Sequence, residues 1–241
     1  MQDDTDAFGQ MVMAAHNGNR VFEIVEREDG HISASDNAER YFDGFRKWPS
    51  HERQSRRLGC GRVLEVGCGA GRWLLELQKR GHEVVGIDSS PLAVQVCRER
   101  GANDVRLRSL TRIATDLGRF DTIMMMGNNF GLLGNERRAR WLLRRLRSLV
   151  RDGGRIVAES TDPAATDDPV HLAYHQSNRR RGRLPGQIRM RVRHSTSKSA
   201  WFDYLLVSRD EAEKLVDGTG WAIRDVVQGD TPHYVMSLEQ V

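Results

Sequence analysis

The stretch Arg62-Val-Leu-Glu-Val-Gly-Cys-Gly-Ala-Gly-Arg72 decides the fold, because an apolar run leads into glycines at the alternate positions Gly67, Gly69 and Gly71. The apolar run predicts a buried strand, and the residues from Gly71 to Arg80 predict a helix. Glycines between a strand and a helix let the backbone turn sharply and let a ligand contact it closely. The stretch therefore predicts the first half of a βαβ unit.

A second predicted strand, His82–Asp88, follows this helix and ends in an acidic residue. Ser90 is a good N-cap and Pro91 a good first helical residue, so another helix is expected next. Further strands are predicted at residues 104–108, 120–126, 155–159, 221–227 and 234–238. Strands that alternate with helices at this spacing predict βαβ units and a parallel sheet.

The glycine turn and Asp88 follow neighbouring predicted strands, at the edge where open α/β sheets bind ligands. An acid at this place can accept two hydrogen bonds from a ribose diol. A dinucleotide fold is the rival interpretation, but its fingerprint GxGxxG would need a third glycine where this chain has Arg72. Alternate glycines preceded by Glu65 favour a sulfonium nucleoside, which has no pyrophosphate to bind.

Three segments carry a resemblance to a known family. Val63–Arg72 closely resembles motif I of class I S-adenosylmethionine-dependent methyltransferases, Gly86–Leu92 resembles the family's second-strand motif, and Leu149–Ile156 resembles its motif before the fifth strand. The resemblance covers about residues 58–160. It implies a doubly wound, Rossmann-like α/β fold with seven strands in the order 3-2-1-4-5-7-6, the last strand antiparallel.

The resemblance also implies which residues bind S-adenosyl-L-methionine and its product S-adenosyl-L-homocysteine. Glu65 is expected near the methionine end, Asp88 on both ribose hydroxyls, and the loop Leu110–Ile113 over the adenine. The expected cofactor-binding residues are Glu65, Gly67, Cys68, Gly69, Gly71, Arg72, Asp88, Ser89, Thr111, Arg112, Met126, Gly127 and Asn128. From the residues alone, Glu65 could instead be a surface strand acid and Asp88 a helix-capping acid, while Cys68 is interpreted as a small side chain rather than a nucleophile.

The catalytic group stays open, with His171, His175 and Asn129 as candidates. Methyl transfer depends above all on alignment of the acceptor, and a general base adds about 10²–10⁴-fold. The two histidines are four residues apart, so they would share one face of a helix. A zinc site would need more ligands nearby, and no metal is expected. Ordinary surface histidines, and turn formation at Asn128 and Asn129, are the alternatives.

The acceptor class is narrowed by motifs that the sequence lacks. Gly127-Asn-Asn-Phe-Gly131 stands where enzymes that methylate exocyclic base nitrogens commonly carry Asn/Asp-Pro-Pro-aromatic, and no Pro-Cys dipeptide occurs. Asp121 lies at the start of its strand, so a catechol-type metal site is not supported. We therefore predict methyl transfer to oxygen or nitrogen of a small molecule. The alternatives are an RNA-modifying methyltransferase and a donor-binding protein without catalysis.

The predicted organisation is an N-terminal cap segment, residues 1–57, followed by a methyltransferase domain, residues 58–241. Residues 1–20 are expected to be weakly ordered, and 36–58 to be helical with a break at Pro49. Its aromatic residues Tyr41, Phe42 and Trp48 form either a lid over the cofactor or core packing. Residues 161–207 are expected to be a β-rich, acceptor-binding insertion with little helical periodicity before 178.

Charge and composition add weaker constraints. The formal net charge is +4, which does not by itself establish a nucleic-acid partner. Seven arginines and no acid lie in Asn178–Arg193, where they indicate either an acidic acceptor or a solvated strand face. Three cysteines without metal spacing, an acidic start and no long apolar run predict a cytoplasmic protein, monomeric or homodimeric, with no membrane span.

Overall fold

The computed structural model describes residues 5–241, and the chain divides into two compact units. The first unit comprises the chain up to Trp48, Leu64–Ile113 and Arg189–Phe202. The second comprises Pro49–Val63, Ala114–Ile188 and Asp203–Val241.

The larger sheet has seven strands in the order β11-β12-β7-β6-β3-β4-β5. Their bounds are β3 Arg62–Val66, β4 Glu83–Asp88, β5 Val105–Leu107, β6 Phe120–Met125, β7 Val150–Thr161, β11 Trp221–Gln228 and β12 His233–Gln240. β4 pairs with β5 and β6 with β7 in parallel, whereas β12 runs antiparallel to β7 and to β11. The predicted doubly wound fold, the strand order and the antiparallel last strand are confirmed.

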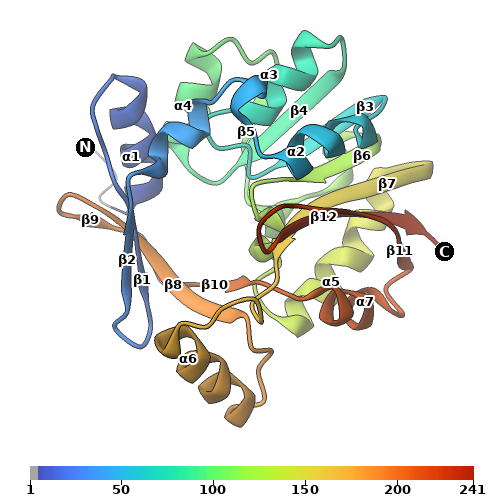
Figure 1. Cartoon of the computed structure of the whole chain (residues 1–241). Coiled ribbons are helices and arrows are strands. Elements are labelled where there is room, and N and C mark those ends of the chain that lie inside the picture. The colour runs from blue at the N-terminus through green and yellow to red at the C-terminus, as the bar shows by residue number, and fades with distance from the viewer. Residues whose placement is uncertain (1–4) are drawn as a thin grey trace. The chain divides into compact units, whose positions relative to one another are not determined.

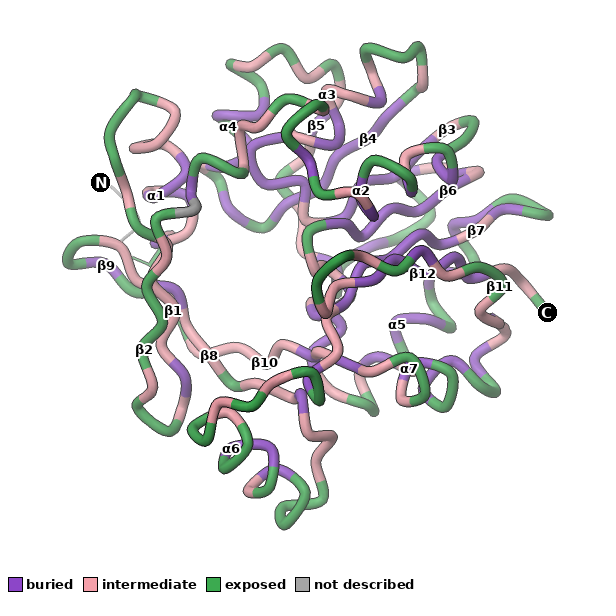
Figure 2. Tube along the Cα trace, viewed as in Figure 1, coloured by how far each residue is buried: buried purple, intermediate pink, exposed green. Residues whose placement is uncertain are grey.

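In the first unit, the helices after β3 and β4 begin where the sequence predicts. α3, Arg72–Lys79, starts directly after Gly71, whose φ of +80° favours glycine. α4, Pro91–Glu99, is capped by the Ser90 side chain, which accepts from the Ala93 N–H at 3.0 Å. Figure 2 shows β4 buried along most of its length, as a parallel strand covered on both faces requires.

The smaller sheet has the order β10-β8-β1-β2, with β9 paired to β8. Its strands are β1 Glu23–Arg27, β2 Ile32–Ser35, β8 Gln187–His194, β9 Ser197–Lys198 and β10 Phe202–Leu205. β1 pairs antiparallel with β2 and with β8, and Figure 1 shows β8 alongside the β1–β2 hairpin. The arginine-rich segment 178–193 therefore includes a strand, β8, as a β-rich insertion requires.

The expectation of weak order at the N-terminus is wrong for the residues that the structure describes, while Met1–Asp4 lie outside them. α1, Ala7–His16, is a helix capped by Asp6, which accepts from the Gly9 N–H at 3.0 Å. Met11 and Val12 are fully buried in a cluster with Ala70 and Val96. A helix that buries so few apolar residues has only weak hydrophobic periodicity in its sequence. Packing against α4 stabilises α1 (Figure 1).

Residues 36–58 form shorter helices than predicted. They contain the 3₁₀ helices Asn37–Phe42, Phe45–Lys47 and Arg56–Leu58, and the α-helix α2, Ser50–Ser55. The break at Pro49 is confirmed. Trp48 is 2% exposed, and its ring centroid lies 4.4 Å from that of Trp73, so Trp48 is a core residue. Phe42 also packs against the buried cluster under α1.

In the second unit, α5, Glu136–Leu146, and α7, Arg209–Val216, lie side by side (Figure 1). Trp221 donates from Nε1 to the Leu143 carbonyl at 2.8 Å, which joins β11 to α5. The strand predicted at 155–159 is longer, because β7 begins at Val150. The segment before 178, which was expected to show little helical periodicity, contains a helix, α6, Pro169–Arg180. Asp168 caps α6 and Pro169 begins it, signals that the weak periodicity masked.

Candidate functional site

The glycine turn after β3 is built from backbone atoms. Gly67, Gly69 and Gly71 all have positive φ, at 71°, 53° and 80°. The N–H groups of Gly67 and Cys68 donate to the Ile87 carbonyl at 2.8 and 3.1 Å, which ties the turn to the end of β4. A Cβ at Gly71 would lie 2.5 Å from Cys97 Sγ, whereas a Cβ at Gly69 would meet no atom closer than 3.7 Å. Gly71 is therefore fixed by packing, whereas a Cβ at Gly69 would make only ordinary van der Waals contact with its neighbours.

The Asp88 carboxylate, at the end of β4, joins the glycine turn to the start of α4. Its Oδ2 accepts from the Gly69 N–H and its Oδ1 from the Ser90 N–H, each at 2.9 Å. Burial raises the pKa of Asp88, and these two N–H groups oppose the shift. Each carboxylate oxygen has a second lone pair, so Asp88 can still accept from a ligand hydroxyl.

Glu65 is a buried acid, 4% exposed, one residue before the end of β3. Its Oε2 has no hydrogen-bond partner among residues 5–241. Burial raises the pKa of Glu65 well above its ordinary value, and the Arg72 guanidinium opposes this. A buried carboxylate oxygen without a donor is costly unless a ligand supplies one. The alternative of a surface strand acid is therefore wrong.

Cys68 is a buried thiol within the turn. The pKa of the Cys68 thiol is raised well above its ordinary value. The largest cause is its hydrogen bond with Cys97, and the second is burial. A protonated, 5% exposed thiol is a poor nucleophile, which supports its interpretation as a small side chain.

The loop after β5 lies at the same edge of the sheet as Asp88. The Arg108 N–H donates to the Asp88 carbonyl at 2.7 Å, and a 3₁₀ helix, Leu110–Arg112, follows. Thr111, Arg112 and Ser89 are all exposed. The first unit thus places Ser89 directly after Asp88, and the hydrogen bond from Arg108 ties the start of the loop that leads to 110–113 to the end of β4.

Two aromatic side chains from the N-terminal segment border the glycine turn. A Cβ built at Gly69 would lie 3.7 Å from Phe8 and 3.8 Å from Tyr41, whose rings meet edge to face at 5.5 Å. Tyr41 donates to Glu23 Oε1 at 2.8 Å. Phe8 was missed by sequence reasoning, because α1 was not predicted.

In the second unit, the turn after β6 contains Met126, Gly127, Asn128 and Asn129. Gly127 and Asn128 have positive φ, at 68° and 63°. The Gly127 N–H donates to Glu159 Oε2 at 2.7 Å, and the Asn128 carbonyl accepts from Tyr204 Oη at 2.6 Å. Thr161 Oγ1 hydrogen-bonds Asn128 Oδ1 at 2.8 Å. Turn formation at Asn128 is therefore observed, in the left-handed conformation that Asn adopts more readily than most residues.

The two candidate histidines lie on α6. His171 is half-buried, with its Nε2 3.8 Å from Asp168 Oδ2 in the first turn of the helix. His175 is 7% exposed and is not a surface histidine.

A histidine and an acid that sequence reasoning missed lie together in the second unit. His51 on α2 is 2% exposed, and its Nε2 lies 3.3 Å from Oε1 of Glu159, which is also 2% exposed. With Glu52, they form the one group within the described chain whose donor atoms, all within 4.8 Å, could hold a metal ion. The two residues are 108 positions apart, so no local motif could reveal the pair.

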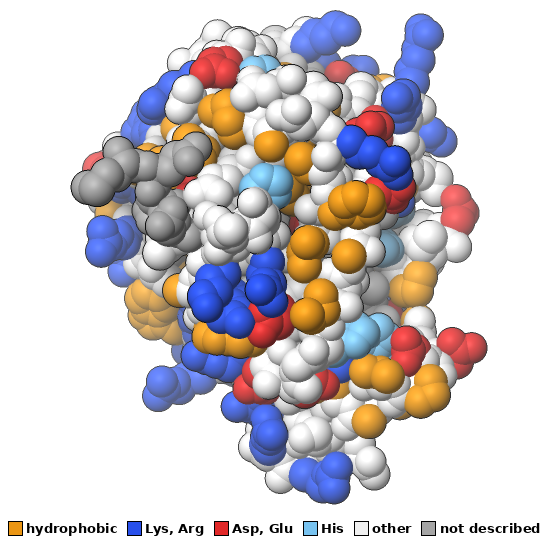
Figure 3. Space-filling view, turned by 90° about the vertical axis from the view of Figure 1, so that its left-hand side faces the viewer, with side chains coloured by type: hydrophobic (Ala, Val, Ile, Leu, Met, Phe, Trp, Pro, Cys, Tyr) orange, Lys and Arg blue, Asp and Glu red, His pale blue; other side chains and the backbone are white. Residues whose placement is uncertain are grey.

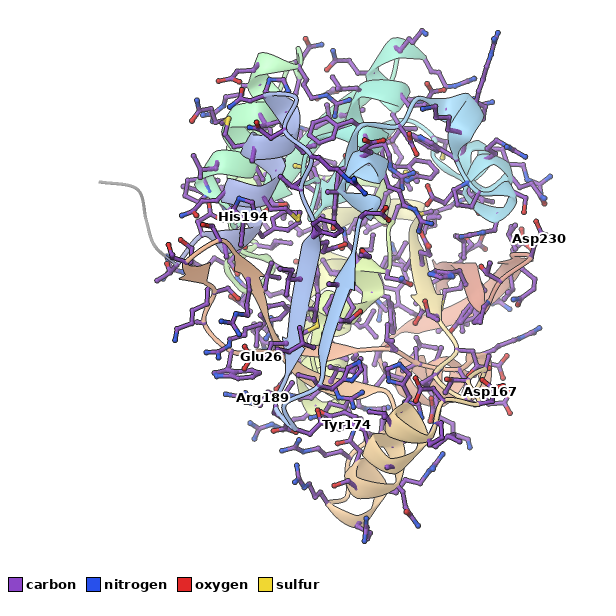
Figure 4. The ribbon with its side chains drawn as sticks, turned by 60° about the vertical axis from the view of Figure 1, so that its left-hand side comes forward. Glu26, Asp167, Tyr174, Arg189, His194 and Asp230 are labelled. Carbon is purple, nitrogen blue, oxygen red and sulfur yellow. The ribbon has the colours of Figure 1, made fainter. Side chains whose placement is uncertain are left out.

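The arginines of β8 are partly neutralised by an acid on β1. Glu26 Oε1 and Oε2 accept from Arg191, both at 2.8 Å, and Arg193 Nη1 donates to Oε2 at 3.1 Å. Figure 4 shows Glu26 on β1 beside the part of β8 that carries Arg189. On the face in Figure 3, basic side chains are interspersed with acidic ones.

A search of the helices within residues 5–241 finds none that is long and apolar enough to cross a membrane.

Comparison with known proteins places these features in a family. Residues 63–154 match the family model described as a methyltransferase domain. A SAM-dependent methyltransferase from Bacteroides fragilis, solved with S-adenosyl-L-homocysteine, has a TM-score of 0.84 at 24% identity and covers 100% of this chain and 97% of its own.

Two curated relatives are similar over shorter stretches. The 2-heptyl-1-hydroxyquinolin-4(1H)-one methyltransferase of Mycobacteroides abscessus is 33% identical over 73 residues, 30% of each protein. The magnesium-protoporphyrin O-methyltransferase of Rhodobacter capsulatus is 33% identical over 72 residues, 28% of this chain and 32% of the relative. This chain thus matches less than a third of the length of either relative. The match over residues 63–154, the strand order and the glycine turn show a methyltransferase domain, and the chain as a whole has the fold of the Bacteroides fragilis enzyme.

Proposed function

We propose that this protein transfers the methyl group of S-adenosyl-L-methionine to an oxygen or nitrogen of a small-molecule acceptor and releases S-adenosyl-L-homocysteine. The observation that carries the proposal is the orphaned Oε2 of buried Glu65, one strand away from a carboxylate that closes a glycine turn. A methionine ammonium would supply the donor that Glu65 lacks, and a ribose would occupy the second lone pairs of Asp88.

The residues of the first unit fit this donor. Gly69 has no Cβ, so a ligand can approach its backbone, with the Phe8 and Tyr41 rings 3.7 and 3.8 Å from the position of a built Cβ. Ser89, Thr111 and Arg112 are exposed at the same edge and would flank the adenine. Gly67, Cys68, Gly71 and Arg72 complete the turn. The donor supplies an activated methyl group, so the chain has to bind it, align an acceptor and exclude water.

The turn after β6 is our proposed position for the acceptor side of the reaction. Met126, Gly127, Asn128 and Asn129 follow β6, and Tyr204 from the segment 161–207 contacts Asn128. The hydrogen bond from Tyr204 in this segment to Asn128 in the turn supports an acceptor-binding role for residues 161–207. The names of both curated relatives describe small-molecule acceptors, a quinolone and a porphyrin, which supports the same class here.

RNA modification remains the second candidate, but the arginines of β8 weigh against it. Arg191 and Arg193 are held by Glu26, so fewer free cations are left for phosphates. RNA affinity that falls steeply as salt rises would favour this candidate.

The proposal is tested by titration calorimetry of the full chain with S-adenosyl-L-methionine and S-adenosyl-L-homocysteine, together with a structure of the product complex. We expect both ligands to bind, with the ribose on Asp88. A complex with the ligand away from the glycine turn, or selective binding of a nicotinamide dinucleotide, would overturn the assignment. Donor binding without turnover on a broad acceptor panel would favour a binding protein without catalysis.

A further inference from the structure

The buried pair His51–Glu159 has the arrangement of an oriented histidine. His51 Nε2 faces Glu159 Oε1 at 3.3 Å, and the other carboxylate oxygen, Oε2, is fixed by the Gly127 N–H at 2.7 Å. A carboxylate that accepts from one ring nitrogen selects the tautomer protonated there and leaves the other nitrogen as a base. Glu159 therefore favours His51 with a proton on Nε2 and a lone pair on Nδ1.

The backbone at Gly229 lies close to that nitrogen. Nδ1 of His51 accepts no hydrogen bond from the residues that the structure describes. A Cβ at Gly229 would lie 2.6 Å from Nδ1, so any side chain at this position would obstruct it. The adjoining turn is tied to the start of α2, because Ser50 Oγ donates to Asp230 Oδ2 at 2.8 Å, with Asp230 labelled in Figure 4.

The pair also lies at the edge of the sheet where the reaction is proposed to occur. Glu159 is two residues before the end of β7, and Gly127 directly follows Met126 after β6. The carboxyl ends of parallel strands are the ligand-binding edge of an open α/β sheet. The groups facing His51 are Glu159 from β7, His233 from β12, whose ring stacks on it at 5.8 Å, and Glu52 from its own helix.

We propose that His51 is the general base of this enzyme, that Glu159 positions it, and that the acceptor atom is a hydroxyl oxygen of phenol or enol type. This inference rests on the proposed function. A hydroxyl oxygen has to lose its proton as it is methylated, whereas an amine can attack with its lone pair and lose a proton to water later. A base preorganised beside the site is therefore most useful to an oxygen acceptor.

The proposed methyl transfer needs only the donor, the acceptor hydroxyl, His51 and Glu159. The acceptor oxygen forms a bond to the methyl carbon, the carbon–sulfur bond breaks, and its electron pair stays on the sulfur. The hydroxyl proton passes to Nδ1 of His51, giving an imidazolium that the Glu159 carboxylate stabilises. The proton then leaves to water after the methylated product departs.

The first experiment needs no acceptor. Nitrogen-15 spectra of the full-length chain, with His51 assigned by the variant His51→Asn, report which ring nitrogen carries the proton. We expect Nε2–H at neutral pH in the wild type, and a smaller Nε2–H fraction in Glu159→Gln. A proton on Nδ1 in the neutral wild-type ring would overturn the proposal, since that nitrogen would then have no lone pair to accept one.

The second experiment measures turnover of phenols, N-hydroxy heterocycles and amines with labelled S-adenosyl-L-methionine. We expect methylated hydroxyl compounds, and a kcat about 10²–10⁴-fold lower in His51→Asn with donor Kd unchanged. Methylation of amines only, or a kcat within threefold of wild type, would overturn the proposal.

Variants of Glu159 separate positioning from a structural role. Glu159→Gln should lower kcat more than KM, and Glu159→Asp, which restores the carboxylate, should recover part of the loss. Equal unfolding temperatures for the Gln and Asp variants would show that stability does not explain the difference. If Asp recovers nothing, Glu159 does not act through its charge.

The chain offers a matched control in a second histidine–glutamate pair. His16 Nε2 lies 3.2 Å from Glu99 Oε2 on the surface of the first unit. His16→Asn and Glu99→Gln should leave kcat and its pH profile unchanged.

Two further measurements distinguish failure of the proposed function from failure of the general-base proposal. Absence of donor binding to the wild-type chain in calorimetry would refute the proposed function, whatever the state of His51. One equivalent of zinc or manganese per purified chain, lost in His51→Asn, would make His51, Glu52 and Glu159 a metal site and would overturn the general-base proposal.

Discussion

The turns after β3 and after β6 both follow the carboxyl ends of parallel strands, yet they are held in opposite ways. The first has three glycines with positive φ and is tied to β4 by its own N–H groups. The second has Gly127 and Asn128 with positive φ and is held by side chains from distant segments, those of Glu159, Thr161 and Tyr204.

This difference determines which substitutions each turn can tolerate. A turn built from backbone is damaged when a side chain is added, because the added atoms occupy the space left for a ligand. A turn held by side chains is damaged when a polar atom is removed, because a backbone group then loses its partner. The following substitutions test this contrast.

The largest effect is expected for Gly69→Val in the backbone-built turn. We expect the donor Kd to rise by about 100-fold or more, equal to roughly 2.7 kcal/mol, because the added side chain would stand where the donor is proposed to contact the Gly69 backbone. Titration calorimetry measures this effect. Gly81→Val is the matched control, since Gly81 also has positive φ, +86°, but no atom within 4 Å of a built Cβ. Equal donor affinity in the Gly69→Val and Gly81→Val variants would show that the glycine turn does not contact the donor.

Asp88→Ala is expected to have the next largest effect. It removes the acceptors of the Gly69 and Ser90 N–H groups and the proposed ribose contacts, each worth about 1.5–3 kcal/mol when the acceptor is charged. We expect at least tenfold weaker donor binding in calorimetry. Asp104→Ala, which removes the partner of Arg106, is the control and should leave the affinity unchanged.

Glu65→Gln is expected to alter pH dependence more than affinity. Because burial raises the pKa of Glu65 in the folded chain, the folded state holds this proton above pH 4.5, where the unfolded state releases it. The stability from this group is therefore complete below pH 4.5 and falls as pH rises toward the raised pKa. Denaturant titrations should show this decline in the wild type and not in Glu65→Gln. Donor binding should release a proton in the wild type alone, measured by calorimetry in two buffers.

The smallest effect is expected for Tyr204→Phe in the turn held by side chains. Loss of the hydrogen bond to the Asn128 carbonyl should cost about 0.5–1.5 kcal/mol of unfolding free energy and raise the acceptor KM. Tyr234→Phe is matched, because Tyr234 Oη donates to the Val207 carbonyl at 2.9 Å. It should cost similar stability without changing KM. A KM change in both variants would make the Asn128 contact merely structural.

The sequence predicted the first turn well because its determinants are contiguous. Alternate glycines, a strand-ending Asp88 and the Ser90–Pro91 helix start all act within a few residues, so local rules apply to them. The strand order followed from the resemblance and is confirmed. By contrast, α1 and α6 were missed, because their apolar periodicity is weak and tertiary packing stabilises them.

The second turn could be predicted only in part. Asn128 and Asn129 were placed after the fourth strand of the parallel core, but their supports were not. His51 is separated from Glu159 by 108 residues, and although a helix was expected after Pro49, the contact of His51 with β7 was not. Pairings of this kind arise only when the chain is folded, so a single sequence contains no local pattern for them.

Asp6 has a practical consequence for work with this protein. Its Oδ1 caps α1 at Gly9, while its Oδ2 accepts from Ser90 Oγ at 2.9 Å and from the Leu92 N–H at 3.2 Å at the start of α4. One carboxylate thus joins the first helix to the segment that follows Asp88. Fusion partners and affinity tags are therefore better attached after Val241, which is 64% exposed, than beside Asp6.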